Sequence, residues 1–278
     1  MKILLITGLS NSEIRDHLDF FKDRKIYHQL IRLFHIPERV GQLGDCVPWA
    51  PKLISALENN PEVELHVFAP HIRLKRRYMT FVLRGVTYHF YRMEYTSLLR
   101  KIGNYKIWKR LQNCSYYFKK VLKKVEPDLV VLSGAENPAS SVAILYAKNY
   151  PKLCLCQTIY NNPQRAQYET PNKLVQELEK DIFSHVDYYG VYCKMHYELL
   201  RQLNPKAHIF KFGYPGVGKM MQPAPTEKVY DFVNFAMVVS EKKGYYDAVK
   251  ALAIVKEKYP SVTLNLVGKL DPDARSKP

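Results

Sequence analysis

The stretch Tyr230–Gly268, YDFVNFAMVVSEKKGYYDAVKALAIVKEKYPSVTLNLVG, contains a complete strand–helix–strand pattern. An apolar run is followed by a Lys-Gly turn, by an amphipathic segment of helical period and by a second apolar run. The first residues, Met1–Thr7, read MKILLIT and form a similar short apolar run. The sequence therefore begins the same kind of unit twice, and only ten residues follow the second one. We expect two domains, of which the second is incomplete.

Strand patterns and helical patterns alternate along the chain, which predicts parallel strands with right-handed crossovers. Many strand candidates are continuous apolar runs, as in sheets covered on both faces. The predicted strands are Lys2–Thr7, Val63–Ala69, Val86–Tyr91, Leu129–Ser133, Leu153–Thr158, Tyr188–Tyr192, His208–Phe212, Phe232–Val238 and Thr263–Val267. Helices are predicted at Val47–Asn59, Ile107–Val125, Ala139–Asn149, Asn172–Phe183 and Met195–Leu203, with one or two short helices within Leu9–Gly44. The predicted fold class is α/β, a doubly wound, Rossmann-like parallel sheet followed by the first βαβ unit of a second such domain.

A change in composition marks the predicted domain boundary. Gly213–Thr226 reads GYPGVGKMMQPAPT and contains three glycines and three prolines in an aperiodic segment. We therefore expect an N-terminal domain over residues 1–212, a linker over 213–229 and the beginning of a second domain over 230–278.

Composition indicates a globular protein of the cytoplasm. Of the 278 residues, 47% are hydrophobic, and there is no apolar run of 18 residues that would predict a transmembrane helix. Met1–Thr7 lacks the length and the cleavage site of a signal peptide. The five cysteines are odd in number and scattered in spacing, which favours buried reduced thiols over a disulfide or a metal site.

Positive charge is concentrated in one block. The net charge is +16, and between His71 and Lys124 there are 15 Lys or Arg and one acid, Glu94, interleaved with eleven aromatic residues. Such a block is typical of an anionic membrane surface, because aromatic rings settle at the headgroups and cations bind acidic lipids. The same residues could bind nucleic acid by neutralising phosphates and stacking on bases. A third interpretation, the solvated face of ordinary helices, accounts for roughly half of them.

Four motifs resemble the GT-B-fold glycosyltransferases of family 4, also called group 1, and the resemblance covers nearly the whole chain. The motifs are Gly41-Gln-Leu-Gly44-Asp45 before a helix, Glu126–Pro138 (EPDLVVLSGAENP), Gln157–Asn161 (QTIYN) and Phe235–Gly244 (FAMVVSEKKG). The family has a glycine loop at the first position and a strand of the form PDxxxxxG at the second. This chain departs from the family pattern in two places. Many relatives have a histidine at the third motif or at the preceding strand end, and this chain has none in either place. The usual Gly-Arg pair of the fourth motif is also absent here.

The resemblance implies particular site residues. Gly41, Gly44, Asp45, Glu136, Asn137 and Gln157 are the expected acceptor-binding residues, because ligands of open α/β sheets bind beyond the carboxyl ends of strands. For Asn137, the start of a helix is an equally good interpretation. Lys243 and Gly244 are the expected binding residues for the donor diphosphate, since a cation stabilises the charge that develops on the leaving group. A solvated lysine at a helix start is the competing interpretation of Lys243.

The resemblance further implies a reaction. A retaining enzyme of this family transfers a sugar from a nucleotide sugar to a saccharide or lipid-linked acceptor, without a metal or another cofactor, in the synthesis of cell-surface polysaccharide or glycolipid. The family's Glu-x7-Glu donor motif would follow Gly268, so the catalytic residue is not visible and this chain is expected to be inactive alone. The alternative is a non-catalytic basic module that binds an anionic membrane surface or nucleic acid. The sequence does not indicate which oligomeric state the protein adopts.

For the basic block we favour the membrane interpretation over nucleic acid. Members of the family often act on lipid-linked acceptors, and the sequence has no zinc-finger, RNP or KH signature. We therefore expect a cytoplasmic protein that sits at the inner face of the membrane. The patch residues are expected to be Arg76, Arg77, Lys109, Arg110, Lys119 and Lys120.

Overall fold

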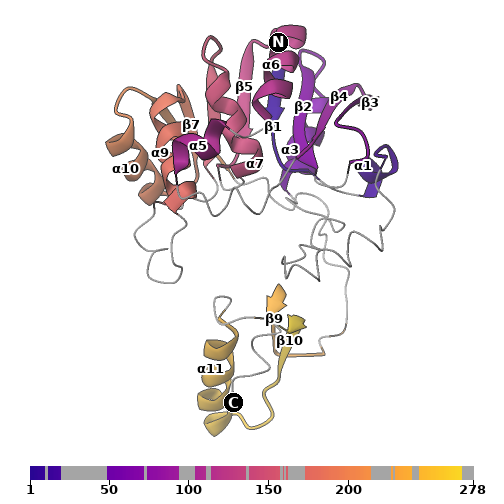
Figure 1. The fold of residues 1–278 in the computed structure, drawn as a ribbon. Helices are drawn as coiled ribbons and strands as arrows, with labels where there is room; N and C mark the ends of the chain where they lie inside the picture. Colours follow the sequence, from indigo (N-terminus) through magenta and orange to yellow (C-terminus); the bar gives the residue numbers. More distant parts are fainter. Residues whose placement is uncertain are drawn as a thin grey trace, which may run out of the picture. The chain divides into compact units, whose positions relative to one another are not determined.

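The computed structural model divides the chain into two compact units, Met1–Gly216 and Val217–Pro278, and each is described by itself (Figure 1). The structure describes residues 1–9, 12–19, 49–71, 74–93, 104–110, 114–135, 138–156, 159, 161, 173–213, 227, 229–239 and 244–270.

The first unit is built on an eight-stranded sheet with the order β3-β4-β2-β1-β5-β6-β7-β8. Neighbouring strands are parallel except for β3, which is antiparallel to β4. This confirms the predicted doubly wound α/β sheet. The strands are β1 (Lys2–Ile6), β2 (Glu64–His71), β3 (Tyr78–Leu83), β4 (Val86–Arg92), β5 (Leu129–Ser133), β6 (Lys152–Cys156), β7 (Tyr188–Val191) and β8 (His208–Lys211).

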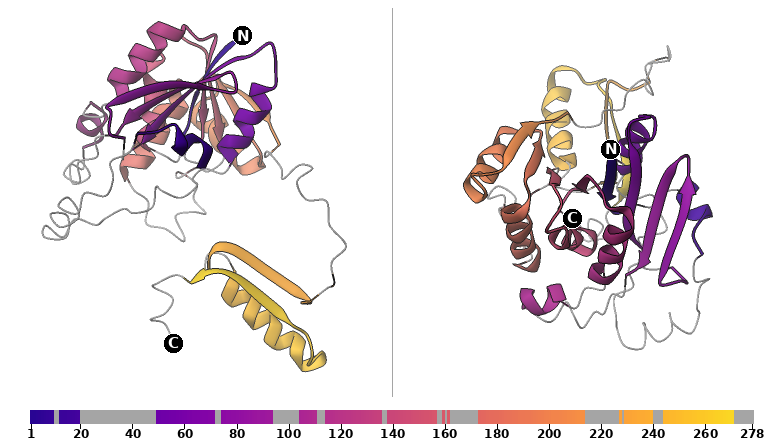
Figure 2. Two further views of the ribbon diagram at one scale, coloured as in Figure 1. Left: turned by 90° about the vertical axis from the view of Figure 1, so that its right-hand side faces the viewer. Right: turned by 90° about the horizontal axis from the view of Figure 1, so that it is seen from above.

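Both faces of this sheet are covered, which explains the continuous apolar runs. In β1, the side chains of Leu4 and Ile6 enter one core cluster, and those of Ile3 and Leu5 enter the other. The cluster of Ile3 and Leu5 includes residues of α1 (Ser12–Asp16) and α3 (Trp49–Glu58). The opposite cluster includes residues of α5 (Tyr105–Arg110), α6 (Cys114–Val125), the 3₁₀ helix η1 (Val142–Tyr146), α9 (Lys173–His185) and α10 (Lys194–Leu203) (Figure 2).

Three local features differ from the sequence prediction. Strand β3 was not predicted, because it is a half-buried edge strand whose pattern is neither continuous nor cleanly alternating. It forms a hairpin with β4 through Arg84 and Gly85, which both have positive φ, as a tight two-residue turn requires. The helix predicted over Ile107–Val125 is described as two separate helices, α5 and α6. The helix predicted over Ala139–Asn149 is α7 (Pro138–Ser141) followed by η1.

The second unit is one βαβ element. Strands β9 (Phe232–Val239) and β10 (Leu264–Leu270) are parallel, and α11 (Tyr245–Lys258) connects them, which confirms the predicted βαβ unit. The carboxylate of Asp231 accepts hydrogen bonds from the backbone N–H and the hydroxyl of Thr263, both at 2.9 Å, and so aligns the strand starts. The Tyr245 hydroxyl donates to the Val267 carbonyl at 2.7 Å and joins the helix start to β10.

Candidate functional site

The order in which strands are added to the sheet reverses between β1 and β5. From β1, strands β2 and β4 are added on one side, and β5 to β8 are added on the other. In doubly wound sheets, ligands bind at the carboxyl ends of the strands at this reversal. Ile6 pairs with Leu132, so the residues that follow, Thr7-Gly8 and Ser133-Gly134, lie side by side at the carboxyl edge. The strand ends therefore carry matching hydroxyl–glycine pairs at the place where this fold binds ligands.

The two hydroxyls at this reversal differ in their hydrogen bonding. Thr7 is buried, its N–H donates to the Phe68 carbonyl at 3.1 Å, and its hydroxyl donates to the Gly8 carbonyl at 3.2 Å. Ser133 is only 5% exposed, and its Oγ has no hydrogen-bond partner among the described residues. A buried hydroxyl without a partner is destabilising. Gly134 follows with a φ of 88°, so the chain turns sharply beside this buried hydroxyl.

His196 lies near the same edge, at the start of α10. The side chain is 3% exposed, its ring lies 5.2 Å from the ring of Tyr192, and it is hydrogen-bonded to the backbone of Cys156 at the end of β6. Its Nδ1 has no partner among the described residues. Burial lowers the pKa of His196, although the bond to the Cys156 backbone opposes this shift. The imidazole is therefore held neutral, and Nδ1 can accept a hydrogen bond from a ligand.

His196, Thr7 and Ser133 were not among the predicted site residues. The family motifs predict a histidine at a strand end, whereas His196 reaches the end of β6 from α10. For Thr7 and Ser133 the signal was available, since each is a hydroxyl residue followed by glycine at the end of an apolar strand. Their proximity depends on strand order, which the sequence alone did not provide.

Asn161, which follows β6 in the sequence, is bonded to α9. The Asn161 backbone N–H and its Nδ2 each donate to Glu179 Oε2 at 3.0 Å, and Nδ2 also donates to the Gln176 carbonyl at 3.0 Å. Glu179 is completely buried in α9. Between β6 and Asn161, Ile159 is packed into the hydrophobic core.

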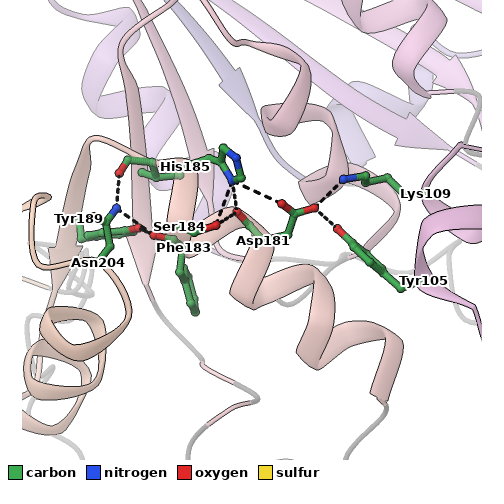
Figure 3. Close-up of polar contacts among 9 residues, drawn as sticks. Tyr105, Lys109, Asp181, Phe183, Ser184, His185, Tyr189 and Asn204 are labelled. Carbon is green, nitrogen blue, oxygen red and sulfur yellow. Dashed lines mark hydrogen bonds and ion pairs between the residues drawn. The ribbon is translucent and has the colours of Figure 1, made fainter.

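A second polar network joins α5 to α9 (Figure 3). Asp181 Oδ2 accepts hydrogen bonds from the Tyr105 hydroxyl at 2.5 Å and from Lys109 Nζ at 2.6 Å. Burial raises the pKa of the Asp181 carboxyl, but the hydrogen bonds from Lys109 and Tyr105 outweigh it, so that the pKa is lowered. The carboxylate is thus ionised and fastens α5 to the domain.

The same network contains a serine, a histidine and an aspartate, but not in the geometry of a catalytic triad. Ser184 Oγ and the Asp181 carboxylate both approach Nδ1 of His185, at 3.0 and 3.4 Å, and the Asp181 carbonyl is 2.7 Å from the same nitrogen (Figure 3). A triad needs the serine and the carboxylate on opposite ring nitrogens, so that the imidazole can relay a proton. These contacts cap the end of α9 and have no catalytic geometry.

Of the predicted basic patch, Lys109 is partly buried and the other residues are exposed. Lys109 makes the ion pair with Asp181, and its ammonium lies 5.3 Å from the ring centre of Tyr105. Lys119 Nζ lies 5.2 Å over the ring of Tyr146, although Lys119 itself is exposed. The other predicted patch residues, Arg76, Arg77, Arg110 and Lys120, are also exposed.

The aromatic residues of the basic block are mostly internal. Tyr91 and Phe118 are fully buried, and the ring of Tyr117 stacks on that of Tyr78 at 5.8 Å. Among the described residues of the block, Tyr116 is the one exposed aromatic side chain. The described aromatic residues of the block therefore serve mainly in packing, while the lysines of α6 face solvent.

The predicted donor site is partly described. Gly244 precedes α11 with a φ of 70°, a conformation that other residues rarely adopt, and a Cβ there would meet no atom within 4 Å. The glycine is thus required by backbone conformation rather than by close packing. Lys243 lies outside the described residues, as do the predicted acceptor residues Gly41, Gly44, Asp45, Glu136, Asn137 and Gln157.

Within the described ranges, no three His, Cys, Asp or Glu side chains gather closely enough to hold a metal ion. No helix in this part of the chain is long and apolar enough to cross a bilayer. Cys154 and Cys156 are buried, form no disulfide with a described cysteine, and have sulfur atoms 3.9 Å apart.

Comparison with known proteins relates the fold to solved structures. No family model matches the sequence, and no curated protein matches it. Sucrose-phosphate synthase from Thermosynechococcus elongatus is similar with a TM-score of 0.58 and 14% identity, over 98% of this chain and 63% of that one. The E. coli trehalose-6-phosphate protein bound with UDP-2-fluoro glucose has a TM-score of 0.55 and 9% identity, over 98% and 65%.

A third structure, a UDP-N-acetylglucosamine 2-epimerase, has a TM-score of 0.50 and 12% identity over 98% of this chain and 69% of that one. A synthase and an epimerase thus share the architecture, so the fold alone does not choose a reaction. The chain spans about two thirds of the length of these structures. The likeness identifies its fold as the Rossmann-like architecture of GT-B proteins.

Proposed function

We propose that this chain is the acceptor-side part of a glycosyltransferase, which moves a sugar from a nucleotide-sugar donor to a saccharide or lipid-linked acceptor. The observation that carries the proposal is the buried Ser133 hydroxyl, which has no hydrogen-bond partner in the described part of the chain and lies beside Thr7 at the reversal of a GT-B-type sheet. A hydroxyl in such a place is suited to a polyhydroxyl ligand, which both donates and accepts hydrogen bonds. The wider role is the synthesis of cell-surface polysaccharide or glycolipid.

In the proposed reaction the second unit binds the donor. The left-handed turn at Gly244 begins α11, and the backbone N–H groups of a helix start favour an anion such as a diphosphate. Lys243 immediately precedes this turn in the sequence and would add a cationic donor as the leaving diphosphate gains charge. The reaction would retain anomeric configuration and require no metal. Catalysis would rest on positioning and on stabilisation of the leaving group.

The second unit needs further polypeptide to become a donor domain. Phe235 is 79% exposed and Ile254 is 68% exposed, and Phe232 and Val233 of the same short sheet are also exposed. Apolar surface of this kind is normally covered in a folded domain, and a two-stranded element has marginal stability alone. We propose that additional strands and helices cover it in the active enzyme, and that this chain alone is inactive.

The test compares this chain with a version extended through the remainder of a second domain. Both are assayed for hydrolysis and transfer with a panel of nucleotide sugars, and for nucleotide binding by calorimetry. Activity confined to the extended protein, lost on replacing Lys243 by Ala and retained on replacing the exposed Lys250, would support the proposal. Absence of both nucleotide binding and transfer in the extended protein would overturn it.

A second candidate function, a basic binding module, is favoured by the exposed face of α6. Lys119, Lys120, Lys123 and Lys124 all face solvent, and α6 contains no acidic residue. We propose that this face binds an anionic membrane surface, which would place the protein at the inner face of the cytoplasmic membrane. Each lysine near acidic lipid contributes about 1 kcal/mol.

The membrane proposal is tested by flotation with vesicles that contain or lack phosphatidylglycerol. Flotation should require the anionic lipid and should be lost on replacing Lys120 and Lys123 by Glu. Lys180→Glu is the control, because Lys180 is an exposed lysine of α9 in the same unit. Flotation that is independent of lipid charge, or binding confined to RNA and steeply weakened by salt, would contradict it.

A further inference from the structure

A hollow lies at the amino edge of the sheet, opposite the strand ends described above. It has a volume of about 680 Å³ and is formed by the three segments that lead into β6, β7 and β8, at residues 148–152, 184–188 and 204–208. The structure describes every residue that lines it. Small-molecule sites in proteins commonly measure about 300–1,000 Å³, so this hollow is large enough for one.

Hydrogen bonds between the three segments fix the shape of the hollow. The Asp187 N–H donates to the Lys152 carbonyl at 3.1 Å, and the His208 N–H donates to the Asp187 carbonyl at 2.9 Å. Asn204 Nδ2 donates to the Val186 carbonyl at 3.1 Å and so joins the segment before β8 to the segment before β7. A ligand would therefore meet groups that are already in place, which lowers the entropy cost of binding.

The hollow carries an excess of positive charge. It is lined by three lysines, Lys148, Lys152 and Lys206, and Asp187 is the one acid among these described lining residues. That carboxylate is used by Lys152, because its Oδ2 lies 3.0 Å from Lys152 Nζ and accepts the Lys152 N–H at 2.9 Å. Lys148 and Lys206 are exposed, and no described acid forms an ion pair with either. Two positive charges therefore remain for an anionic ligand.

Two stacked aromatic rings also line the hollow. The rings of Tyr188 and His208 lie 5.5 Å apart between centroids, with an angle of 23° between their planes. The two residues are neighbours because they pair where β7 and β8 begin. Tyr188 is 41% exposed, so part of its ring is open to solvent. An exposed aromatic ring of this kind can stack on a planar heterocycle such as a nucleobase.

We propose that this hollow binds a nucleotide, with its phosphates at Lys148 and Lys206 and its base on the Tyr188–His208 rings. Lysine suits the phosphates because its ammonium is a point charge with three hydrogen-bond donors. Reactants of this fold bind at the opposite, carboxyl edge of the sheet, so a nucleotide held here is an effector rather than the sugar donor. The inference is therefore independent of the proposed sugar transfer.

Calorimetric titration of this chain with ADP and with pyrophosphate tests the assignment. ADP should bind, and Lys148→Glu and Lys206→Glu should each weaken its binding by at least about tenfold, because repulsion replaces a charge-assisted hydrogen bond. Both lysines are exposed residues of connecting segments, so these variants should fold normally. Lys194→Glu is the matched control, since it changes the charge equally at an exposed position of α10 outside the hollow.

A further pair of variants separates the base from the phosphates and this site from the donor site. Tyr188→Leu keeps an apolar side chain but removes the ring, so it should weaken ADP by about fivefold or more and leave pyrophosphate unchanged. Lys243→Ala should change neither affinity. No binding at millimolar ADP, or binding that survives Lys148→Glu and Lys206→Glu but is lost in Lys243→Ala, would overturn the proposal. Pyrophosphate binding as tight as that of ADP, with no effect of Tyr188→Leu, would overturn the assignment of a nucleotide.

Discussion

Lowering the pH should weaken the first unit through one buried histidine. His89 in β4 is fully buried between two hydrogen-bonding neighbours, with His66 Nδ1 3.1 Å from its Nε2 and the Tyr78 hydroxyl 2.7 Å from its Nδ1. His66 in turn contacts Glu64 at 2.9 Å. All of these contacts are satisfied when Tyr78 donates to His89, His89 to His66 and His66 to Glu64. A neutral His89 is the form that fits this chain of hydrogen bonds.

The size of the expected loss of stability follows from the pKa shift of His89. Burial, together with the charges of His66 and Lys124, lowers the pKa of His89 from 6.5 to about 4. The unfolded chain then binds more protons than the folded chain between these two values, so stability falls as the pH falls. Between about pH 7 and pH 5.5 the free energy of unfolding should decrease by about 1 kcal/mol from this group alone.

Urea unfolding followed by tryptophan fluorescence measures this change. Both tryptophans, Trp49 and Trp108, belong to the first unit, and Trp108 is buried in its core, so the signal reports on unfolding of this unit. Replacing His89 by Phe should lower stability at pH 7, because Tyr78 and His66 lose a partner. It should also remove about 1 kcal/mol of the pH dependence. The test is therefore the change of the free energy of unfolding with pH, rather than its value at pH 7.

The control is His208→Gln. His208 is an exposed histidine at the start of β8 and takes no part in the buried chain of hydrogen bonds around His89. Its removal should leave the pH dependence as in the unsubstituted protein. If His89→Phe keeps the full pH dependence while His208→Gln reduces it, the reasoning about the buried chain is wrong.

Three further predictions concern the framework. Lys109→Met should destabilise the first unit by about 1–2 kcal/mol in urea unfolding, because Asp181 loses a charged partner at 2.6 Å. Lys106 is exposed, so Lys106→Met should change the free energy of unfolding little. Equal effects of the two substitutions would contradict the network. Gly190→Ala should lower the melting temperature and the free energy of unfolding, the latter by about 1–3 kcal/mol, since its Cβ would lie 2.9 Å from two side chains. An unchanged melting temperature would contradict the close packing around Gly190. Gly244→Ala should cost about 1 kcal/mol through its φ of 70°, seen as faster hydrogen exchange in α11; unchanged exchange there would argue against the left-handed turn.

The fold was predictable because its signal is local and repeated. Continuous apolar runs such as β1 and β5 can be recognised without knowing their neighbours, and Leu129–Ser133 was predicted with the same bounds as β5. Strand β3 was missed because an edge strand is half exposed and carries mixed residues such as Thr80 and Met79. Its identity comes from pairing with β4, which is a tertiary property.

The site was less predictable because its members come from separate elements. Ser133 and Thr7 are far apart in the sequence and meet only because β5 pairs with β1. Glu179 has the sequence pattern of an ordinary helical glutamate, and only its burial and its contact with Asn161 distinguish it. Local patterns report propensity, whereas these residues are defined by contacts over long sequence distances.

Helix α9 links these observations into one argument about the edge. Glu179 accepts hydrogen bonds from Asn161, Asp181 holds α5 through Lys109, and Asn204 donates to the Phe183 carbonyl at the end of the helix. With its apolar side packed in the core, the helix is fixed on several sides. A site that works by positioning needs such a rigid support, because misplacement by about 1 Å can lower a rate by about a hundredfold. The exposed cations of α6 need no comparable rigidity to bind a surface, so substitutions along α9 and α6 should separate the proposed catalysis from the proposed membrane attachment.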